Sequence, residues 1–456
     1  MNRGTHARRI KLSGLVQGVG FRPFVYGLAR DHGLAGWVRN EVGEVLVEVE
    51  GDATAIERFC ADLVQRAPPL ARPAVTSEEA AEPTGLKGFE IVASSAASAA
   101  NIFVPTDHFA CTDCLRELAD LEDRRYRYPF INCTNCGPRY TLITGMPYDR
   151  ANTTMAGFTL CAACRAEYEN PQDRRFHAEP VACPDCGPQL TFCRTESQES
   201  LTGDAALTAA VAALRTGKIV AAKGIGGYHL LCDARDDAAV GTLRERKHRP
   251  DKPLAVMFPT AGDDGLDRVR EAVVPTEAEA HAMISDLRPI VLVRRRQRDG
   301  LSPFVAPGLN ELGVFLPYSP MHQLVLDAFG APLVATSGNL SGEPVLTENV
   351  EAQARLASIA DAFLHHNRPI QRPADDSVLR TTRDRPRPLR LGRGAAPLEL
   401  TLSAELARPL LAVGGQMKGA IAIAWKNRAV ISPHIGEMDT PRSLKVFEAT
   451  VHDLQS

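Results

Sequence analysis

Eight cysteines between residues 111 and 186 have the spacing of metal ligands. They form two copies of the pattern Cys-x2-Cys-x18-Cys-x2-Cys, at Cys111, Cys114, Cys133 and Cys136 and again at Cys161, Cys164, Cys183 and Cys186. A Cys-x-x-Cys turn points two thiolates at one cation, and two such turns complete a closed tetrahedral site that suits Zn²⁺. The spacing predicts two structural zinc ions. It does not tell whether each ion takes its ligands from one repeat or from both.

The other interpretations of these cysteines are redox-active dithiols or an iron–sulfur cluster. Repetition at a constant spacing disfavours both. Zinc ribbons often bind nucleic acid, but residues 101–190 contain nine Arg against 12 acidic residues, so a docking or spacer role is favoured. Cys60, Cys193 and Cys232 lie outside the pattern and are expected to be ordinary residues.

A second candidate site is the glycine-rich segment Gly14–Arg22, which reads GLVQGVGFR between a predicted strand and a predicted helix. Glycines allow a close backbone approach, and successive N–H groups before a helix make a concave anion site. Arg22 can add a bidentate contact to a phosphate. A plain glycine-rich turn with a surface arginine would have the same composition. The loop residues of the candidate site are Gln17, Gly18, Val19, Gly20 and Phe21.

This loop and its surroundings resemble the acylphosphatases, whose signature matches GLVQGVGFR. The resemblance implies that Arg22 holds the phosphoryl group. It also implies that Asn40, in GWVRNEVGEVLVEVEG, positions the attacking water. An acyl phosphate has a good leaving group, so orientation and charge stabilisation suffice for its hydrolysis.

The elements around this loop follow the order β-α-β-β-α-β of a ferredoxin-like domain over residues 8–93. Apolar periodicity predicts two helices and four strands. The helices span 21–32 and 53–65, and the strands span 9–15, 34–40, 45–50 and a closing strand at 88–93. Residues 105–193 then form the tandem zinc-finger domain.

A third candidate site is formed by two polar stretches in residues 201–391. The chain has only nine Lys against 43 Arg, yet Lys223, Lys247 and Lys252 fall within 30 residues of one another. Lys247 and Arg249 precede an apolar strand, and Ser337 and Asn339 follow the strand PLVAT. Cations at a strand end suit an anionic ligand. Either stretch alone would be read as a solvated loop.

Together the two stretches resemble the YrdC family, which makes carbamoyl-type adenylates from ATP. Its Lys-x-Arg and Ser-x-Asn motifs match Lys247, Arg249, Ser337 and Asn339. The resemblance implies a cationic cavity for ATP, bound with Mg²⁺, and for a small carbamate-type acid. Lys223, Lys252 and Arg390 are further candidate contacts.

Helical and strand-like stretches alternate over residues 201–391, which predicts a mainly parallel α/β domain. Residues 409–456 contain two apolar strands around Gly414–Lys418. They resemble the first phosphate hairpin of actin-like ATPase folds, although a simple hairpin would look the same. The sequence stops at Ser456, so we expect a truncated first part of that domain.

Composition limits the partners. The 456 residues suggest about three domains. The net charge of −3 argues against a dominant nucleic-acid or anionic-membrane partner. The absence of an apolar run long enough for a membrane span, or of an export signal, predicts a cytoplasmic protein. A reducing compartment also disfavours disulfides.

The order of these domains resembles the HypF family of hydrogenase-maturation carbamoyltransferases. That resemblance implies hydrolysis of carbamoyl phosphate, formation of carbamoyl-adenylate, and transfer of the carbamoyl group to the C-terminal cysteine of HypE for cyanide ligand synthesis. The transfer would need the missing domain. Two alternatives remain: a threonylcarbamoyl-AMP synthase that modifies tRNA, and a non-catalytic zinc-ribbon binding module. The acylphosphatase-like domain disfavours the first, and the intact site motifs disfavour the second.

Overall fold

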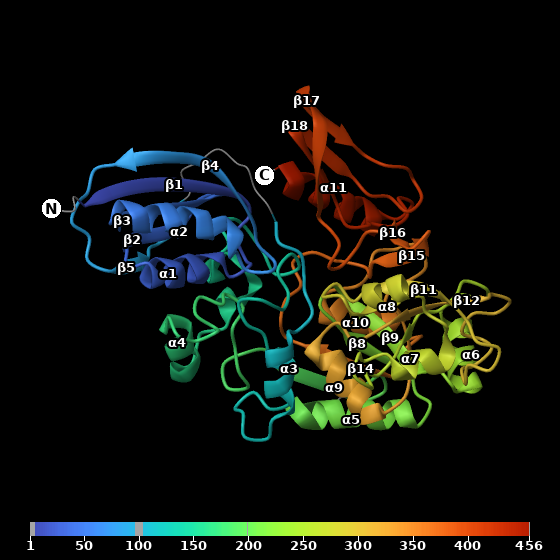
Figure 1. Ribbon diagram of the computed structural model, residues 1–456. Helices are drawn as coiled ribbons and strands as arrows, with labels where there is room; N and C mark the ends of the chain where they lie inside the picture. Colours follow the sequence, from blue (N-terminus) through green and yellow to red (C-terminus); the bar gives the residue numbers. More distant parts are fainter. Residues whose placement is uncertain (1–4, 96–103, 198, 456) are drawn as a thin grey trace. The chain divides into compact units, whose positions relative to one another are not determined.

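The computed structural model describes residues 5–95, 104–197 and 199–455 (Figure 1). The chain divides into two compact units, one of residues 1–105 and 132–187 and the other of residues 106–131 and 188–456. Each unit has its own buried apolar cluster. No helix among the described residues is both long and apolar enough to cross a membrane.

The first unit contains a five-stranded sheet in the order β4-β1-β3-β2-β5, with α1 and α2 packed on it (Figure 1). Helix α2 begins where the Asp52 carboxylate accepts hydrogen bonds from Thr54 N and Ala55 N. The elements of the unit are β1 (His6–Leu15), α1 (Phe21–Asp31), β2 (Ala35–Asn40), β3 (Val45–Gly51), α2 (Ala53–Gln65), β4 (Arg72–Ala81), β5 (Phe89–Ile91), η1 (Arg150–Asn152), η2 (Thr154–Gly157) and α4 (Ala162–Glu169).

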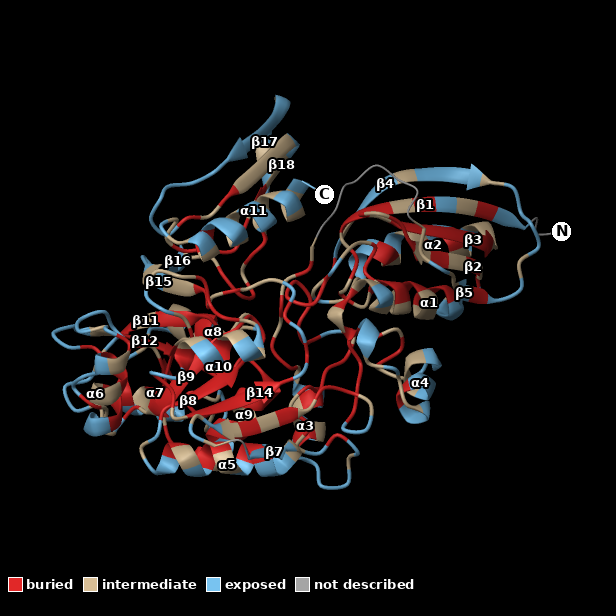
Figure 2. Cartoon of the chain, turned by 180° about the vertical axis from the view of Figure 1, so that it is seen from behind, coloured by how far each residue is buried: buried red, intermediate tan, exposed pale blue. Residues whose placement is uncertain are grey.

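The predicted ferredoxin-like order is confirmed, but the prediction of which strand closes it was wrong. The closing strand is β4, which pairs antiparallel with β1. The segment predicted at 88–93 forms β5, which lies at the opposite edge and runs parallel to β2. Strand β4 reads RPAVTSEEAA and has no buried residue, because it lies at an edge with both faces open (Figure 2). It therefore lacks the apolar alternation that predicts a strand.

The second unit is built on an eleven-stranded sheet in the order β16-β15-β11-β12-β10-β13-β9-β8-β14-β6-β7. Its strands are β6 (Leu190–Arg194), β7 (Ser200–Thr202), β8 (Val220–Lys223), β9 (Tyr228–Asp233), β10 (Val256–Met257), β11 (Ile290–Arg294), β12 (Glu311–Phe315), β13 (Leu333–Ser337), β14 (Ala362–His366), β15 (Val378–Thr382) and β16 (Arg385–Arg390). Its helices are α3 (Thr112–Ala119), α5 (Gly203–Arg215), α6 (Asp237–Arg246), α7 (Asp267–Ala272), α8 (Glu277–Ile284), α9 (Pro320–Phe329) and α10 (Asn349–Leu356).

The sheet is mixed, so the prediction of a mainly parallel sheet was wrong. Among the described strands, parallel pairs are formed by β10 with β12, β11 with β15, and β8 with β14. The other neighbours are antiparallel. Central strands such as β8, β9 and β14 are buried (Figure 2). A strand buried on both faces has a continuous apolar sequence whatever its direction, so composition alone did not reveal the pairing.

The C-terminal residues form a separate two-stranded hairpin followed by a helix. Strand β17 (Leu398–Ala412) pairs antiparallel with β18 (Ala422–Ile431), and α11 (Pro441–Gln455) follows. The segment predicted at Gly414–Lys418 lies in the connection between the strands. Most of β17 is exposed (Figure 2).

Candidate active sites and metal centres

The loop before α1 has the backbone shape that a phosphate cradle requires. Gly18 and Gly20 have φ values of +70° and +73°, which other residues rarely adopt. Gly20 is also the N-cap of α1, and no side chain caps that helix. The side chains of Val19 and Phe21 are buried in the core, each 1% exposed. These two residues therefore fix the loop through packing and leave only their backbone groups for a ligand.

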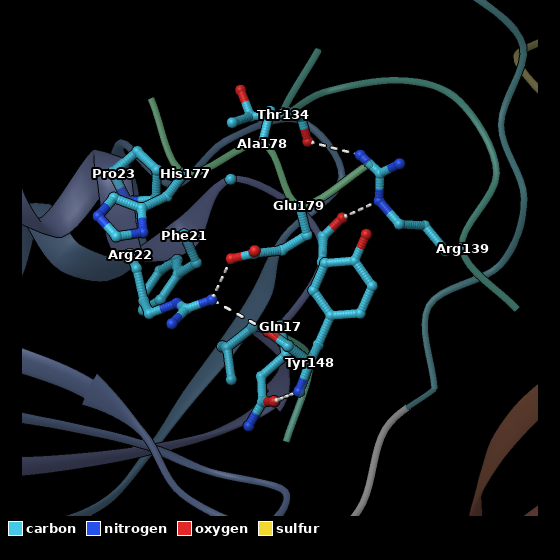
Figure 3. Close-up of a pocket in the computed structure, with 13 residues that line it drawn as sticks. Gln17, Phe21, Arg22, Pro23, Thr134, Arg139, Tyr148, His177, Ala178 and Glu179 are labelled. Atoms are coloured by element: carbon cyan, nitrogen blue, oxygen red, sulfur yellow. Dashed lines mark hydrogen bonds and ion pairs between the residues drawn. The ribbon is translucent and has the colours of Figure 1, made fainter. Parts of the chain in front are cut away.

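Arg22 is buried and makes ion pairs with two carboxylates, of which Figure 3 draws Glu179. Its Nη2 atom lies 2.9 Å from Glu179 Oε1 and donates to the carbonyl oxygen of Tyr148 at 3.0 Å. Its Nη1 atom lies 2.8 Å from Asp149 Oδ1. Burial opposes the charge of the guanidinium, but Glu179 and Asp149 raise the pKa of Arg22 above its ordinary value. The arginine therefore stays charged.

Asn40 is completely buried at the end of β2 and approaches the same carbonyl oxygen as Arg22. Its Nδ2 atom donates to Tyr148 O at 3.3 Å. Its Oδ1 atom is buried and has no hydrogen-bond partner among the described residues. A buried oxygen without a donor is costly, and a water molecule or a ligand N–H can satisfy it. The structure thus brings Arg22 and Asn40 to one point.

Gln17 connects the loop to two other segments. Its Nε2 atom donates to the carbonyl oxygens of Glu41 and Glu44, at 2.7 and 3.0 Å. Its Oε1 atom accepts from Tyr148 N at 3.0 Å (Figure 3). The side chain of Gln17 therefore holds the loop against these segments, and only the backbone of Gln17 is left to contact an anion.

A small cavity of about 20 Å³ lies beside Arg22, and its wall includes His177 and Glu179 (Figure 3). Burial, helped by the charge of Arg22, lowers the pKa of His177 to about 4, so this imidazole is neutral at pH 7. Desolvation raises the pKa of Glu179, although Arg22 and the Tyr168 hydroxyl favour its ionised form. The site combines Arg22 with carboxylates that neutralise it, and a second cation, Arg139, lines the same cavity and donates from Nε to the Gly18 carbonyl oxygen at 2.7 Å.

Sequence reasoning missed Tyr148, Asp149 and Glu179. A signal for Glu179 lies in the internal repeat, because the residue 50 positions earlier is Pro129. The carboxylate is thus peculiar to the second repeat. The other two residues are separated from the loop by more than 120 positions and follow no motif.

The eight predicted metal ligands form two four-sulfur groups. Within each group the Sγ atoms all lie within 4.8 Å of one another. In the second group neighbouring sulfurs are 3.6 to 3.8 Å apart. That spacing fits a tetrahedral ion, because Zn–S bonds of about 2.3 Å place the sulfurs about 3.8 Å apart. Each group comes from a single repeat, which answers the question that spacing left open. Both are closed structural zinc sites.

Local structure holds the thiolates in place. Cys161 is the N-cap of α4, and its Sγ atom accepts a hydrogen bond from Cys164 N at 3.4 Å. Cys111 occupies the same position before α3. A helix N-terminus favours negative charge, so each first thiolate is stabilised by the helix that follows it.

Loss of one ligand should therefore remove one ion. We expect Cys183→Ser to lower the zinc content from about two ions per chain to about one, because structural sites couple metal binding to folding. Cys60→Ser, which changes a half-buried cysteine outside both groups, should leave the content unchanged. Metal analysis of the purified variants checks this. Loss of both ions from Cys183→Ser would contradict independent sites.

The second unit contains a cavity of about 650 Å³, within the range of about 300 to 1,000 Å³ for small-molecule sites. It lies beside the end of β13 and the turn after α6. Six of the seven predicted ATP-site residues line it: Lys247, Arg249, Lys252, Ser337, Asn339 and Arg390. Acidic groups also reach the wall, among them Asp375 and Glu437.

Lys247, Ser337 and Asn339 touch one another at the cavity wall. Lys247 Nζ donates to Ser337 O and Asn339 O, each at 2.7 Å, and to Asn339 Oδ1 at 3.0 Å. Ser337 Oγ donates to the same Oδ1 atom at 2.8 Å. Burial and the nearby charge of Arg249 lower the pKa of Lys247 to about 7. Burial likewise lowers the pKa of Arg249 to about 10. The site holds its cations close together and favours an anion.

Lys223 does not line this cavity. It ends β8, and its Nζ atom donates to Asn349 Oδ1 at 2.8 Å. The same Oδ1 atom accepts from the Tyr228 hydroxyl at 2.9 Å. Burial lowers the pKa of Lys223 to about 8. Sequence reasoning also missed two cavity residues from the C-terminal segment, Lys418 and His434.

A buried network of charged and polar side chains holds residues of the cavity wall in place. His229 Nε2 lies 2.8 Å from Asp376 Oδ2, and Arg393 Nε donates to Asp376 Oδ1 at 3.0 Å. Desolvation opposes ionisation of Asp376, but His229 and Arg393 outweigh it and hold its pKa well below the usual range. The backbone oxygen of Asp376 accepts from Arg390 Nε at 2.8 Å, which fixes Arg390 at the wall.

Four protein-family models match the chain. They are Acylphosphatase over residues 8–91, HypF finger over 110–143 and 160–193, Telomere recombination over 212–392, and HypF Kae1-like domain over 405–456. The third is the Sua5, YciO and YrdC family. The predicted combination of domains is confirmed.

Single proteins match over almost the whole chain. Carbamoyltransferase HypF of Synechocystis sp. is 46% identical over 447 residues, which is 98% of this chain and 57% of that protein. A crystal structure of full-length HypF in the phosphate- and nucleotide-bound form has 41% identity and a TM-score of 0.93, over 99% of this chain and 58% of that one. The chain thus spans somewhat more than half the length of the relatives it matches.

The alternative of a tRNA-modifying synthase has weaker support. Threonylcarbamoyl-AMP synthase of Bacillus subtilis is 30% identical over 172 residues, which is only 36% of this chain. The match leaves the phosphate loop and the cysteine repeats unexplained.

Proposed function

Because the chain belongs to the HypF family of carbamoyltransferases, we propose that it hydrolyses carbamoyl phosphate and uses the resulting carbamate to make carbamoyl-adenylate. In the first reaction water attacks phosphorus, the P–O bond to the carbamoyl group breaks, and carbamate and phosphate are released. In the second, a carbamate oxygen attacks the α-phosphorus of ATP and pyrophosphate leaves.

The observation that carries this proposal is the presence of two anion sites of different size in one chain. Arg22 lies beside a cavity of about 20 Å³, whereas Lys247 and Arg249 line a cavity of about 650 Å³. The first is lined by the loop and the guanidinium that can hold a phosphoryl group, and the second is large enough for a nucleotide.

Roles follow from these contacts. The loop N–H groups and Arg22 hold the phosphoryl group, and the open acceptor of Asn40 positions water. In the large cavity, Lys247, Arg249, Lys252 and Arg390 compensate the charge of the triphosphate, which is bound with Mg²⁺, while Ser337 and Asn339 orient it. The zinc ions have no open position and only support the fold.

We also propose that the longer protein passes the carbamoyl group to the C-terminal cysteine of HypE, for cyanide ligand synthesis. We assign this step to the part of the relatives that the chain does not span. Eight zinc-binding thiols need a reducing compartment, which favours the cytoplasm.

The direct test is to incubate the chain with ATP and carbamoyl phosphate and identify the products. We expect AMP and pyrophosphate, formed only when carbamoyl phosphate is present. A threonylcarbamoyl-AMP synthase would instead require threonine and bicarbonate. Release of pyrophosphate that depends on threonine, or release of ADP, would contradict the proposal.

The lowered pKa of Lys247 predicts a pH dependence of nucleotide binding. With a pKa of about 7, Lys247 is largely neutral at pH 8, and a bound triphosphate favours the ammonium form. Binding should take up protons, and affinity should decrease as the pH rises above about 7. Calorimetry in two buffers of different ionisation enthalpy measures the uptake. Equal heats in both buffers would contradict it.

A further inference from the structure

The phosphate site contains oxygen acceptors that do not belong to its acylphosphatase-like part. The acylphosphatase match ends at residue 91. Tyr148 O, Asp149 Oδ1 and Glu179 Oε1, which contact Arg22, all come from the later segment. Glu179 is the most enclosed of these residues, at 1% exposure. An acylphosphatase without this segment lacks these three oxygen acceptors.

Acyl phosphates differ in what their acyl part offers to an acceptor. Carbamoyl phosphate has an NH₂ group with two N–H donors, whereas acetyl phosphate has a methyl group in that place. A buried acceptor left facing a methyl group loses its hydrogen bond, so a site built around one rejects the analogue that lacks the donor.

The two carboxylate oxygens of Glu179 have different partners. Oε2 accepts from Arg150 N at 2.9 Å and from the Tyr168 hydroxyl at 2.8 Å, so it is held by two donors of its own segment. Oε1 faces Arg22 (Figure 3). When Arg22 turns to a phosphoryl group in the loop, Glu179 stays fixed through Oε2, and Oε1 needs a new donor.

We propose that Glu179 is a specificity-determining residue, whose Oε1 atom accepts a hydrogen bond from the carbamoyl NH₂ group and thereby selects carbamoyl phosphate over acyl phosphates without an N–H donor. This assignment rests on the proposed hydrolysis at Arg22. A different role for the same contact is competition, in which the carboxylate only blocks Arg22 from phosphate. The two roles differ in what a substitution does to selectivity.

The test compares two non-hydrolysable analogues, carbamoylphosphonate and acetylphosphonate, by calorimetry on the full chain. We expect the first to bind about 100-fold more tightly than the second. Glu179→Gln should bring the two affinities to within about threefold, because the two donors at the Oε2 position hold the amide oxygen there and turn the NH₂ group toward Arg22. An acceptor is thus replaced by a donor without a change of size.

Two further variants complete the design. Glu169→Gln changes an exposed carboxylate of α4 in the same repeat, and it should leave the ratio unchanged. Tyr168→Phe removes one of the donors that hold Glu179, so it should reduce the ratio partially even if Glu179→Gln fails to fold.

The outcomes separate the possibilities. Equal affinity of the wild type for both analogues overturns the assignment and leaves hydrolysis intact. A parallel gain in affinity for both analogues in Glu179→Gln also overturns it, in favour of competition. If the wild type binds neither analogue, the proposed hydrolysis at Arg22 fails, and the role of Glu179 fails with it.

Discussion

Arg22→Ala should lower kcat/KM for carbamoyl phosphate hydrolysis by about 10³-fold, because removal of one fixed donor from developing charge costs about 10² to 10³. The loss should appear mainly in kcat if Arg22 acts on the transition state. Release of inorganic phosphate measures it.

This substitution should also affect stability, since Arg22 is buried between Glu179 and Asp149. Removing one partner of a buried ion pair costs about 3 to 5 kcal/mol. Urea unfolding and zinc content therefore accompany the kinetic measurement. Arg30→Ala, an exposed change on the same helix α1, is the matched control and should leave both unchanged. Normal hydrolysis by a folded Arg22→Ala protein would reject the phosphate site.

Lys247→Ala should abolish the exchange of free pyrophosphate into ATP, which proceeds through reversible formation of carbamoyl-adenylate, while hydrolysis of carbamoyl phosphate continues. The ammonium lies at the wall of the large cavity, held by the oxygens of Ser337 and Asn339. A positioned cation that meets a phosphate in a desolvated site contributes several kcal/mol, so we expect a loss of about 10³-fold or more.

The matched control is Lys218→Ala, which changes an exposed lysine just before β8. Both reactions are measured in the same preparations, so a folding defect would show as a loss of both. Exchange that persists in Lys247→Ala, or hydrolysis that disappears in a variant shown by urea unfolding to be folded, would contradict the assignment of the two reactions to separate sites.

The features that could be predicted from the sequence are those that a short segment determines by itself. The loop before α1 needs its glycines, and its Arg22 follows them directly. Each cysteine pair closes within four residues, and a strand such as β3 shows its apolar pattern locally. In these cases the physical constraint and the sequence signal lie in the same few residues.

The features that could not be predicted depend on distant partners. Strand β4 is formed by backbone pairing with β1, and its exposed side chains carry no pattern. Glu179 meets Arg22 across 157 positions. Lys223 precedes a glycine-rich turn, which made it a candidate ligand contact. In the structure its ammonium instead donates to Asn349, outside the large cavity. Sequence spacing specifies the type of chemistry at a site more readily than its neighbours.

The separation of the metal sites bears on how the tandem repeat could have originated. The cysteines of the two repeats correspond at a constant offset of 50 residues, and each repeat supplies all four sulfurs of its own group. A gene segment that already encoded a complete tetrahedral site could be duplicated in one event. No ancestor with cysteines that lacked a complete metal site is then required. The two copies now differ in their spacers, and only the second has a carboxylate at the position that contacts Arg22, where the first has Pro129.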